Sequence, residues 1–451
     1  MKKLERRAFL CLLMAAALLA GLIFFIARLE INGAKWSAFY ANRHVYTNGA
    51  LRVGSVSDRG GELLLQNDKS GARYSDDSEL RRATYHVVGD LGGNVATAAN
   101  VAFRSKLIGY DPIFGTTGLF RNTGKDLTLT IDADINVAAY RALAGRNGTI
   151  CVYNWRTGEI LAMVSGPSAD PAVKTDGAGS DVPSGTYLNK ALSAVYTPGS
   201  VFKLVTTAAA IEQMEDLNSW TFTCTGSYEI DGEKITCPYA HGKMDFYGAL
   251  ANSCNGAFAS LAVELGGETM REYTEKAGLT DVYEIDGIRT AAGSFNFDSA
   301  KLNIGWAGIG QFEDQVNPLA MMVYTGAIAG EGKAAKPVLL RGSALLDKEG
   351  GRARAGKVKL LEAGTARQIS DMMRNNVKAN YGDSNYPGLS LHAKTGTAEV
   401  GKGKRPHSWF VGFSGDYAFA VCLENSGYGA TAAGPAANQV LQAMKKAGYL
   451  G

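Results

Sequence analysis

Cysteine and histidine are scarce in this chain, with six and five copies among 451 residues. The cysteines are scattered, which excludes a dense disulfide framework. The histidines are dispersed, and on that ground no metal site and no cofactor is expected. Cys224 and Cys237 bracket a segment typical of a hairpin that turns at Asp231-Gly232. A disulfide between them is possible outside the cytoplasm, and two free thiols are the alternative.

An excess of charge of one sign is also missing. Lysine and arginine total 46 against 43 acidic residues, a net charge of +3. A nucleic-acid surface would need a clustered basic stripe, so no nucleic-acid partner is expected. The chain contains no internal repeat and no long low-complexity linker. Hydrophobic residues make up 46% and charged residues 20%, as in an ordinary soluble protein of two or three domains.

The N-terminus carries a long apolar run without charge, from Ala8 to Ala27. Four basic residues precede it: Lys2, Lys3, Arg6 and Arg7. About 20 apolar residues cross a bilayer, and flanking cations stay on the cytoplasmic side. We therefore expect a cytoplasmic tail over residues 1–7, a transmembrane anchor over 8–27, and the rest of the chain outside. A cleaved signal peptide is the alternative, but the run does not end in a small-x-small site.

The most informative motif is Ser200-Val201-Phe202-Lys203, at the start of an apolar, helix-like run. Residues three apart share a helix face, so the Lys203 amine is expected to reach the Ser200 hydroxyl. A lysine in apolar surroundings loses its proton near neutral pH and can act as the base for the serine. A serine near a helix start is more often a cap, so the motif needs support from elsewhere in the chain.

Two further motifs supply that support. Ser253-Cys254-Asn255 opens a helical run that ends at Gly266, and Lys394-Thr395-Gly396 lies on a strand-like segment. Ser294-Phe295-Asn296 repeats the second pattern in a loop-like stretch, so the earlier triplet is preferred. The three motifs, in this order, resemble the Ser-x-x-Lys, Ser-x-Asn and Lys-Thr-Gly set of penicillin-binding proteins and serine β-lactamases.

Each motif can supply a part of an amide-attacking enzyme. Ser200 is expected to be the nucleophile and Lys203 its base. Ser253 can pass a proton between Lys203 and the departing nitrogen. Asn255 can hold the Lys203 amine and donate to the backbone carbonyl of the substrate.

The third motif suits the substrate end of the reaction. The Lys394 ammonium and the Thr395 hydroxyl fit a terminal carboxylate, and Gly396 removes a side chain where the substrate must lie. By resemblance to the family, the backbone N–H groups of Ser200 and Thr397 form the oxyanion hole.

Further segments are similar to class B penicillin-binding proteins, firmly over residues 126–451 and faintly over 50–125. The segments are Ser57–Leu64, Tyr85–Gly89, Thr157–Ser165 and Trp409–Phe413. The resemblance implies a membrane-proximal pedestal over residues 28–125 and a transpeptidase domain over 126–451. The expected fold is α/β (α+β), with an antiparallel sheet flanked by helices and an inserted helical lobe between residues 200 and 330. One transmembrane helix and a small β-rich pedestal come before it.

Local patterns predict where some elements of that domain lie. Residues 126–132 alternate like a strand that enters the catalytic domain, and Asp132 can cap the helix that follows. The segments around 391–398, 407–413 and 417–423 predict a three-stranded antiparallel meander, because short turns join them. A final amphipathic helix is expected near residues 436–446.

The resemblance implies a peptidoglycan D,D-transpeptidase that is acylated at Ser200 by the D-Ala-D-Ala end of stem peptides and by β-lactams. It also implies that the protein acts at the membrane, beside a polytopic glycan polymerase of the SEDS type. The Glu-x-x-Leu-Asn motif of class A β-lactamases is missing, and too few residues precede Ser200 for a glycosyltransferase domain. A D,D-carboxypeptidase and a non-catalytic β-lactam sensor or scaffold are the alternatives. The sequence leaves open a role in elongation, division or sporulation.

Overall fold

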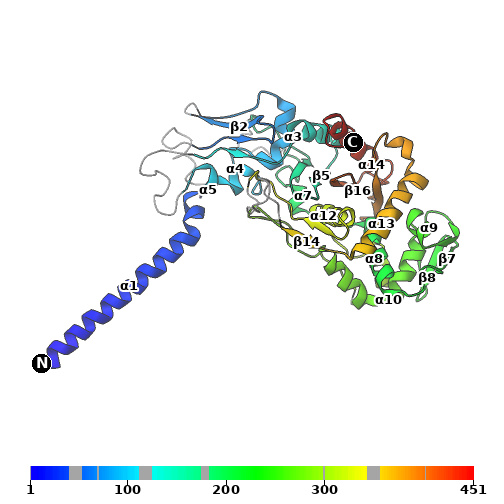
Figure 1. Ribbon diagram of the computed structural model, residues 1–451, viewed down its shortest axis with the longest axis horizontal. Helices are drawn as coiled ribbons and strands as arrows, with labels where there is room; N and C mark the ends of the chain where they lie inside the picture. The colour runs from blue at the N-terminus through cyan, green and yellow to red at the C-terminus, as the bar shows by residue number, and fades with distance from the viewer. Residues whose placement is uncertain are drawn as a thin grey trace.

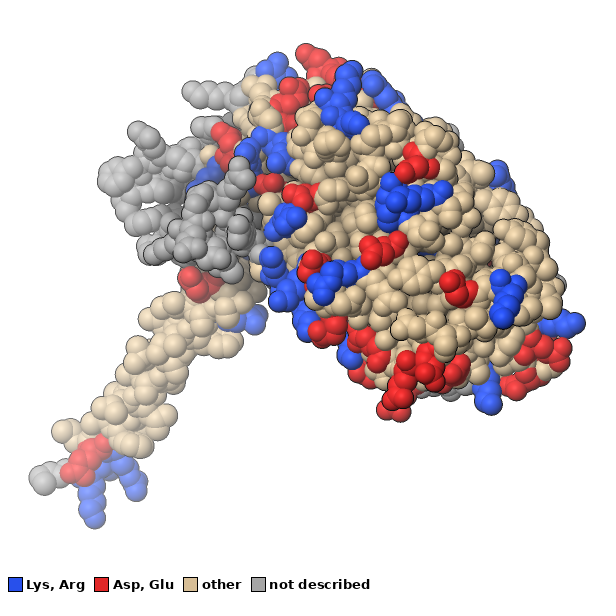
Figure 2. Space-filling model, turned by 45° about the vertical axis from the view of Figure 1, so that its right-hand side comes forward, with Lys and Arg blue, Asp and Glu red and all other residues tan. Residues whose placement is uncertain are grey.

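The first helix stands apart from the rest of the protein. The computed structural model describes residues 2–39, 53–68, 71–110, 124–173, 182–297, 300–342, 356–401 and 403–451. Helix α1 (Lys2–Ser37) extends away from the body of the molecule (Figure 1). Its 36 residues span about 54 Å, more than the ~30 Å of a hydrocarbon core. Figure 2 shows it uncharged along most of its length, with basic residues at its free end. It is thus long and apolar enough to cross a membrane, and it exceeds the predicted span 8–27 at both ends.

A small sheet with accompanying helices follows α1 along the chain. Its strands are β1 (Val56–Ser57), β2 (Leu63–Asp68), β3 (Gly71–Tyr74) and β4 (Leu127–Thr128), in the order β3-β2-β1-β4. The helices are α3 (Ser78–Val88), α4 (Ala99–Ala102) and α5 (Arg104–Leu107). Strands β1 and β4 run parallel, and the other neighbours are antiparallel.

The strand predicted over residues 126–132 is shorter than expected and has a different partner. Only β4 is a strand there, and it pairs with β1 of the small sheet rather than with the catalytic sheet. Asp132 does cap the next helix, α6 (Ala133–Leu143), as predicted. Gly145, with φ of 72°, follows directly after the end of α6. The chain therefore leaves the small sheet before it enters the central one.

The central sheet is fully antiparallel, as predicted. Its strands are β15 (His392–Ala398), β16 (His407–Ser414), β17 (Tyr417–Leu423), β5 (Gly148–Asn154) and β6 (Ile160–Gly166), in that spatial order. The predicted C-terminal meander forms β15 to β17. Strand β15 lies at an edge, which leaves one side of its backbone free for other partners.

Helices cover both faces of this sheet. They include α8 (Lys203–Gln213), α12 (Pro318–Ala329) and α14 (Ala433–Lys446). Because side chains alternate along a strand, Trp409 and Val411 of β16 join one apolar core with α8 and α12. Phe410 joins a second core with α6 and α14 on the opposite face. Burial on both faces explains why the central strands are nearly continuous apolar runs.

The inserted lobe lies between α8 and α12. Its helices are α9 (Phe246–Ala251), α10 (Asn255–Lys276) and α11 (Lys301–Ala307). It also has three short strand pairs: β7 (Thr221–Cys224) with β10 (Gly242–Asp245), β8 (Ser227–Ile230) with β9 (Glu233–Thr236), and β11 (Glu284–Ile285) with β12 (Ile288–Arg289). The hairpin turn at Asp231-Gly232 is confirmed, with positive φ at both residues. Gly266 has a non-helical backbone, with φ of 80°, that divides α10 into two helices, so the first helical run ends at Gly266 as predicted.

The remaining elements of the described chain are mostly short. They are α7 (Lys190–Ser193), the 3₁₀ turn η2 (Gly199–Val201), β13 (Lys333–Ala335), β14 (Lys357–Lys359), α13 (Ala363–Asn376), the π-helical turn η3 (Val377–Tyr381) and the 3₁₀ turn η4 (Asp383–Asn385). Turn η2 packs against β15 and leads directly into α8, so it lies at the edge of the central sheet.

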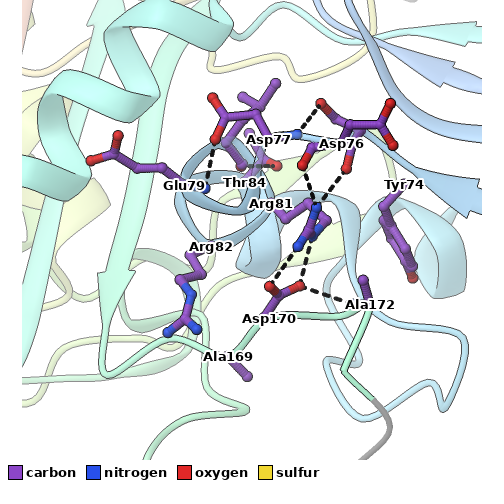
Figure 3. A network of polar contacts seen from close by, with 12 residues as sticks. Tyr74, Asp76, Asp77, Glu79, Arg81, Arg82, Thr84, Ala169, Asp170 and Ala172 are labelled. Carbon is purple, nitrogen blue, oxygen red and sulfur yellow. Dashed lines mark hydrogen bonds and ion pairs between the residues drawn. The ribbon is translucent and has the colours of Figure 1, made fainter.

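An ion pair joins helix α3, beside the small sheet, to the segment that follows β6 of the central sheet. Arg81 of α3 donates two hydrogen bonds, of 2.7 and 2.8 Å, to the carboxylate of Asp170, which follows β6 (Figure 3). The same guanidinium donates to the backbone carbonyls of Ser75 and Asp76. The hydrogen bonds from Arg81 hold the pKa of Asp170 below its ordinary value. The side chains are 14% and 5% exposed, so this contact is shielded from water better than a surface pair.

We predict that Arg81→Ala destabilises the protein by about 2 kcal/mol, because it leaves a buried carboxylate without its charged donor. Arg156→Ala is the matched control. It removes the exposed pair of Arg156 with Asp416 and should cost less than about 1 kcal/mol. Thermal unfolding of the detergent-solubilised protein at neutral pH measures both. Equal midpoints for the two variants would contradict the prediction.

Candidate active site

The Ser200 segment packs closely against strand β15. Ser200 is half-buried in η2, and Lys203 is the first residue of α8. Gly199 has φ of 56°, and a Cβ there would lie 2.6 Å from the carbonyl oxygen of Thr397. Only glycine adopts this conformation so near to the strand without strain. The contact brings the first and third motifs together.

The Lys203 amine is fully buried and points at the second motif. Its Nζ donates to the Ser253 carbonyl at 2.7 Å, to Ser253 Oγ at 3.3 Å and to Asn255 Oδ1 at 2.7 Å. Within the described chain, no hydrogen bond joins Nζ to Ser200 Oγ, although the two residues are one helical turn apart. The predicted contact between base and nucleophile is thus replaced here by three contacts to the second motif. Hydrogen bonds of catalytic groups are often long before substrate binds.

Lys394 contacts the same serine hydroxyl from strand β15. It is fully buried on β15, and its Nζ donates to Ser253 Oγ at 2.9 Å and to the Thr395 carbonyl at 3.0 Å. Ser253 Oγ therefore accepts hydrogen bonds from both amines. Its own hydrogen remains available to a third group.

Burial changes the proton affinity of both lysines. It lowers the pKa of Lys203 to about 7, because a buried ammonium loses its hydration. Burial also lowers the pKa of Lys394 well below its ordinary value, and the charge of Lys203 adds to this effect. Within the described chain, neither amine forms an ion pair with a carboxylate. A neutral Lys203 amine is therefore accessible near neutral pH.

The second motif is held in an unusual conformation. Ser253 has φ of 50°, a left-handed value that is uncommon for a residue other than glycine. Asn255 Nδ2 donates to the Thr236 carbonyl of β9 at 2.8 Å, while its Oδ1 accepts from Lys203. One amide hydrogen of Asn255 is thus used within the protein, and the other is free for the carbonyl that was predicted as its partner.

The backbone of β15 offers a hydrogen-bond donor at the sheet edge. The Thr395 N–H donates to the Tyr381 hydroxyl, on the side of β15 that has no strand. Residues two apart on a strand direct their N–H groups to the same side. The Thr397 N–H is therefore directed to this edge, where η2 lies. The role of Thr397 and Ser200 as oxyanion donors stays a prediction.

The reason for glycine at position 396 differs from the prediction. A Cβ there would meet the Pro198 carbonyl oxygen and Trp409 Cβ at 2.9 Å, and Val201 Cγ1 at 3.0 Å. The space is filled by the protein itself rather than kept open for substrate. Gly396 is required so that η2 can pack against β15.

Sequence analysis missed Tyr381. Its hydroxyl accepts the Thr395 N–H at 3.0 Å and lies 3.1 Å from Thr395 Oγ1. It comes from the π-helical turn η3, and no motif surrounds it in the sequence. Only the packing of η3 along the free edge of β15 brings it to the site.

The predicted disulfide is wrong. Cys224 and Cys237 are both free thiols. Instead, Cys224 Sγ lies 3.3 Å from His241 Nδ1, and Cys237 Sγ lies 3.8 Å from Cys254 Sγ. No metal site was expected, because the histidines are dispersed in the sequence. The fold nevertheless brings the ligand atoms of Cys224, Cys237, His241 and Cys254 within 4.8 Å of one another. The four-residue step from Cys237 to His241 was the available signal.

We predict that Gly396→Ala destabilises the protein by roughly 1–3 kcal/mol, because the methyl group overpacks the contact between η2 and β15. Gly364→Ala is a suitable control, since a Cβ at this helical position meets nothing within 4 Å. It should leave the thermal midpoint unchanged or raise it slightly. A wild-type midpoint for Gly396→Ala would refute this account of the glycine.

The chain is similar to known proteins over most of its length. The family described as "Penicillin binding protein transpeptidase domain" matches residues 148–442. The chain is 26% identical over 367 residues to the peptidoglycan D,D-transpeptidase PbpA of Mycobacterium tuberculosis, covering 71% of this chain and 72% of that protein. It is 25% identical to the peptidoglycan D,D-transpeptidase MrdA of Acinetobacter baumannii, over 69% of this chain and 52% of that one.

Solved structures share the fold. Penicillin-binding protein A of M. tuberculosis, solved as a ceftriaxone acyl-enzyme, superimposes with a TM-score of 0.76 at 23% identity. The match covers 88% of this chain and 99% of that one. PBP2 of Pseudomonas aeruginosa matches with a TM-score of 0.72 over 87% of this chain and 95% of that one, at 24% identity. The chain therefore belongs to the penicillin-binding proteins and carries their transpeptidase domain.

Proposed function

We propose that this protein is a peptidoglycan D,D-transpeptidase that forms peptide cross-links through an acyl-enzyme on Ser200. The observation that carries the proposal is the meeting of three sequence-distant segments at one oxygen. Ser253 Oγ accepts hydrogen bonds from the buried amines of Lys203 and Lys394, at 3.3 and 2.9 Å. A serine lies one helical turn before the first of these amines. A serine that cleaves an amide needs such a base beside it.

Acylation begins when Ser200 Oγ attacks the carbonyl carbon between the two D-Ala residues of a stem peptide. The neutral Lys203 amine takes the hydroxyl proton, and the backbone N–H groups of Ser200 and Thr397 stabilise the oxyanion. The C–N bond then breaks. A proton passes from Lys203 through Ser253 to the departing amine, and the terminal D-Ala leaves.

The second half of the reaction reverses this proton path. The amine of a neighbouring stem peptide attacks the acyl carbon, and its proton passes through Ser253 to Lys203. The ester C–O bond then breaks, and Lys203 returns the proton to Ser200 Oγ. Lys394, with the Thr395 hydroxyl, binds the terminal carboxylate of the donor peptide. That carboxylate would favour the charged form of Lys394, which burial otherwise disfavours. A β-lactam acylates Ser200 by the same route, with its opened ring retained.

We further propose the arrangement of the protein at the membrane. Residues 1–7 are cytoplasmic, residues 8–27 of α1 span the bilayer, and the remainder is extracytoplasmic, because the basic residues lie at the free end of α1. The pedestal includes β4, since β4 pairs with β1, and the catalytic domain follows it. A polytopic glycan polymerase of the SEDS type would supply the glycan strands beside this anchor.

We predict that Ser200→Ala abolishes covalent labelling by a fluorescent penicillin, because alanine has no hydroxyl oxygen on which the acyl bond can form. Ser294→Ala, from the second Ser-x-Asn triplet, is the matched control and should label like the wild type. Both should fold, as checked by the thermal midpoint. Retained labelling of Ser200→Ala would transfer the nucleophile role to another serine.

A product assay distinguishes transpeptidation from its alternatives. The wild-type protein, a glycan polymerase and a defined lipid-linked precursor should together give cross-linked muropeptides, and Ser200→Ala should give none. Loss of terminal D-Ala without cross-links would identify a carboxypeptidase. No product together with intact labelling would indicate a β-lactam sensor.

We predict that acylation slows as pH falls through about 7, because the base form of Lys203 is lost below its pKa. At pH 5.5 the rate should be roughly thirtyfold below its alkaline plateau. The measurement is the labelling rate between pH 5.5 and 8.5, with circular dichroism as the control for folding. A flat profile would exclude Lys203 as the titrating base.

A further inference from the structure

Four side chains that could bind a metal gather in the inserted lobe. None of them has a catalytic role in the proposed reaction. They are Cys224, Cys237, His241 and Cys254, here called the Cys₃His cluster. Their ligand atoms, three Sγ and one imidazole nitrogen, all lie within 4.8 Å of one another. Cys224 and Cys254 are buried, and the other two are half-buried. The lobe lies at the end of the molecule away from α1 (Figure 1).

The local fold brings these residues together from three directions. Cys224 ends β7 and faces Gly242 of β10 across the strand pair, so His241, just before β10, lies beside it. Cys237 follows β9 at the end of the neighbouring hairpin. Cys254 is the N-cap of α10, and its Sγ accepts the N–H of Ala257 at 3.5 Å.

The distances fit a tetrahedral metal rather than a disulfide. Zinc–sulfur bonds of ~2.3 Å place two sulfurs about 3.8 Å apart across a tetrahedral edge. Cys237 Sγ and Cys254 Sγ are 3.8 Å apart, whereas a disulfide requires about 2.0 Å. A zinc-bound sulfur and nitrogen are about 3.5 Å apart, and Cys224 Sγ lies 3.3 Å from His241 Nδ1.

We propose that Cys224, Cys237, His241 and Cys254 bind one Zn²⁺ as a closed structural site. Three thiolates and one imidazole are the donor set of structural zinc, and they leave no position for a catalytic water. Binding releases the three thiol protons to solvent, and no oxidation occurs. The metal ties the β7–β10 and β8–β9 strand pairs of the lobe to the start of α10.

The position of Cys254 links this site to the catalytic centre. Cys254 lies between Ser253 and Asn255, and both of these neighbours hold the Lys203 amine. Asn255 also bonds the carbonyl of Thr236, the residue before Cys237. Zinc bound to Cys254 and Cys237 would fix this loop, including the left-handed backbone of Ser253. The ligands act as positioning residues and do not touch the substrate.

Metal analysis of the full-length protein tests the site directly. Protein purified in detergent, without chelator or a metal-affinity step, should contain about one zinc per chain. His241→Ala should lose most of the metal, whereas His241→Cys, which restores a fourth soft ligand, should retain it. Cys11→Ser, which changes an exposed cysteine in α1, is the matched control and should keep the full content. This measurement does not depend on whether the proposed transpeptidase activity is correct.

Acylation kinetics test the link to the active site. Removal of zinc by a chelator should slow labelling by a fluorescent penicillin about tenfold or more, and zinc addition should restore the rate. His241→Ala should label slowly and His241→Cys at close to the wild-type rate. Less than about 0.1 zinc per chain after incubation with zinc chloride, or a disulfide within the cluster found by peptide mapping, would overturn the site. An unchanged labelling rate after complete zinc removal would overturn its positioning role.

Discussion

The rest of the site depends on two buried amines that share one hydroxyl oxygen. Lys203 and Lys394 are fully buried, and within the described chain their hydrogen-bond partners are neutral oxygens. A buried ammonium without a carboxylate is costly, so the protein shifts the balance toward the neutral amine. That shift turns an ordinary cation into a base. It requires dry surroundings, which the helices on both faces of the central sheet supply.

Turn η2, which carries Ser200, packs closely against the edge strand β15, and this contact positions the side chains of the site. Gly199 and Gly396 remove the side chains that would separate η2 from β15. The same contact brings the Ser200 segment beside residue Thr397 of the edge strand. A sheet edge is elsewhere a liability for aggregation; the proposed function uses it to bind a peptide-like substrate beside the serine. The geometry thus comes from the backbone as much as from the three motifs.

The inserted lobe contributes the second motif and the means of holding it. Ser253 adopts a left-handed conformation that its neighbours must maintain. Asn255 is bonded to β9, and Cys254 caps α10 within the Cys₃His cluster. A loop fixed on both sides in this way can present two oxygens to one amine without rearrangement. Rigidity of this kind is what a preorganised catalytic site requires.

The sequence by itself determined the family, the antiparallel meander of β15 to β17, the cap at Asp132 and the residues of the three motifs. These are local patterns, because period, turn chemistry and short spacings are properties of neighbouring residues. Only the tertiary structure decided that Lys203 turns toward Asn255, that Tyr381 joins the site and that His241 meets the cysteines of the inserted lobe. Each of these depends on which distant segments pack together. Contacts across long stretches of chain are set by the packing of whole elements, which no short pattern encodes.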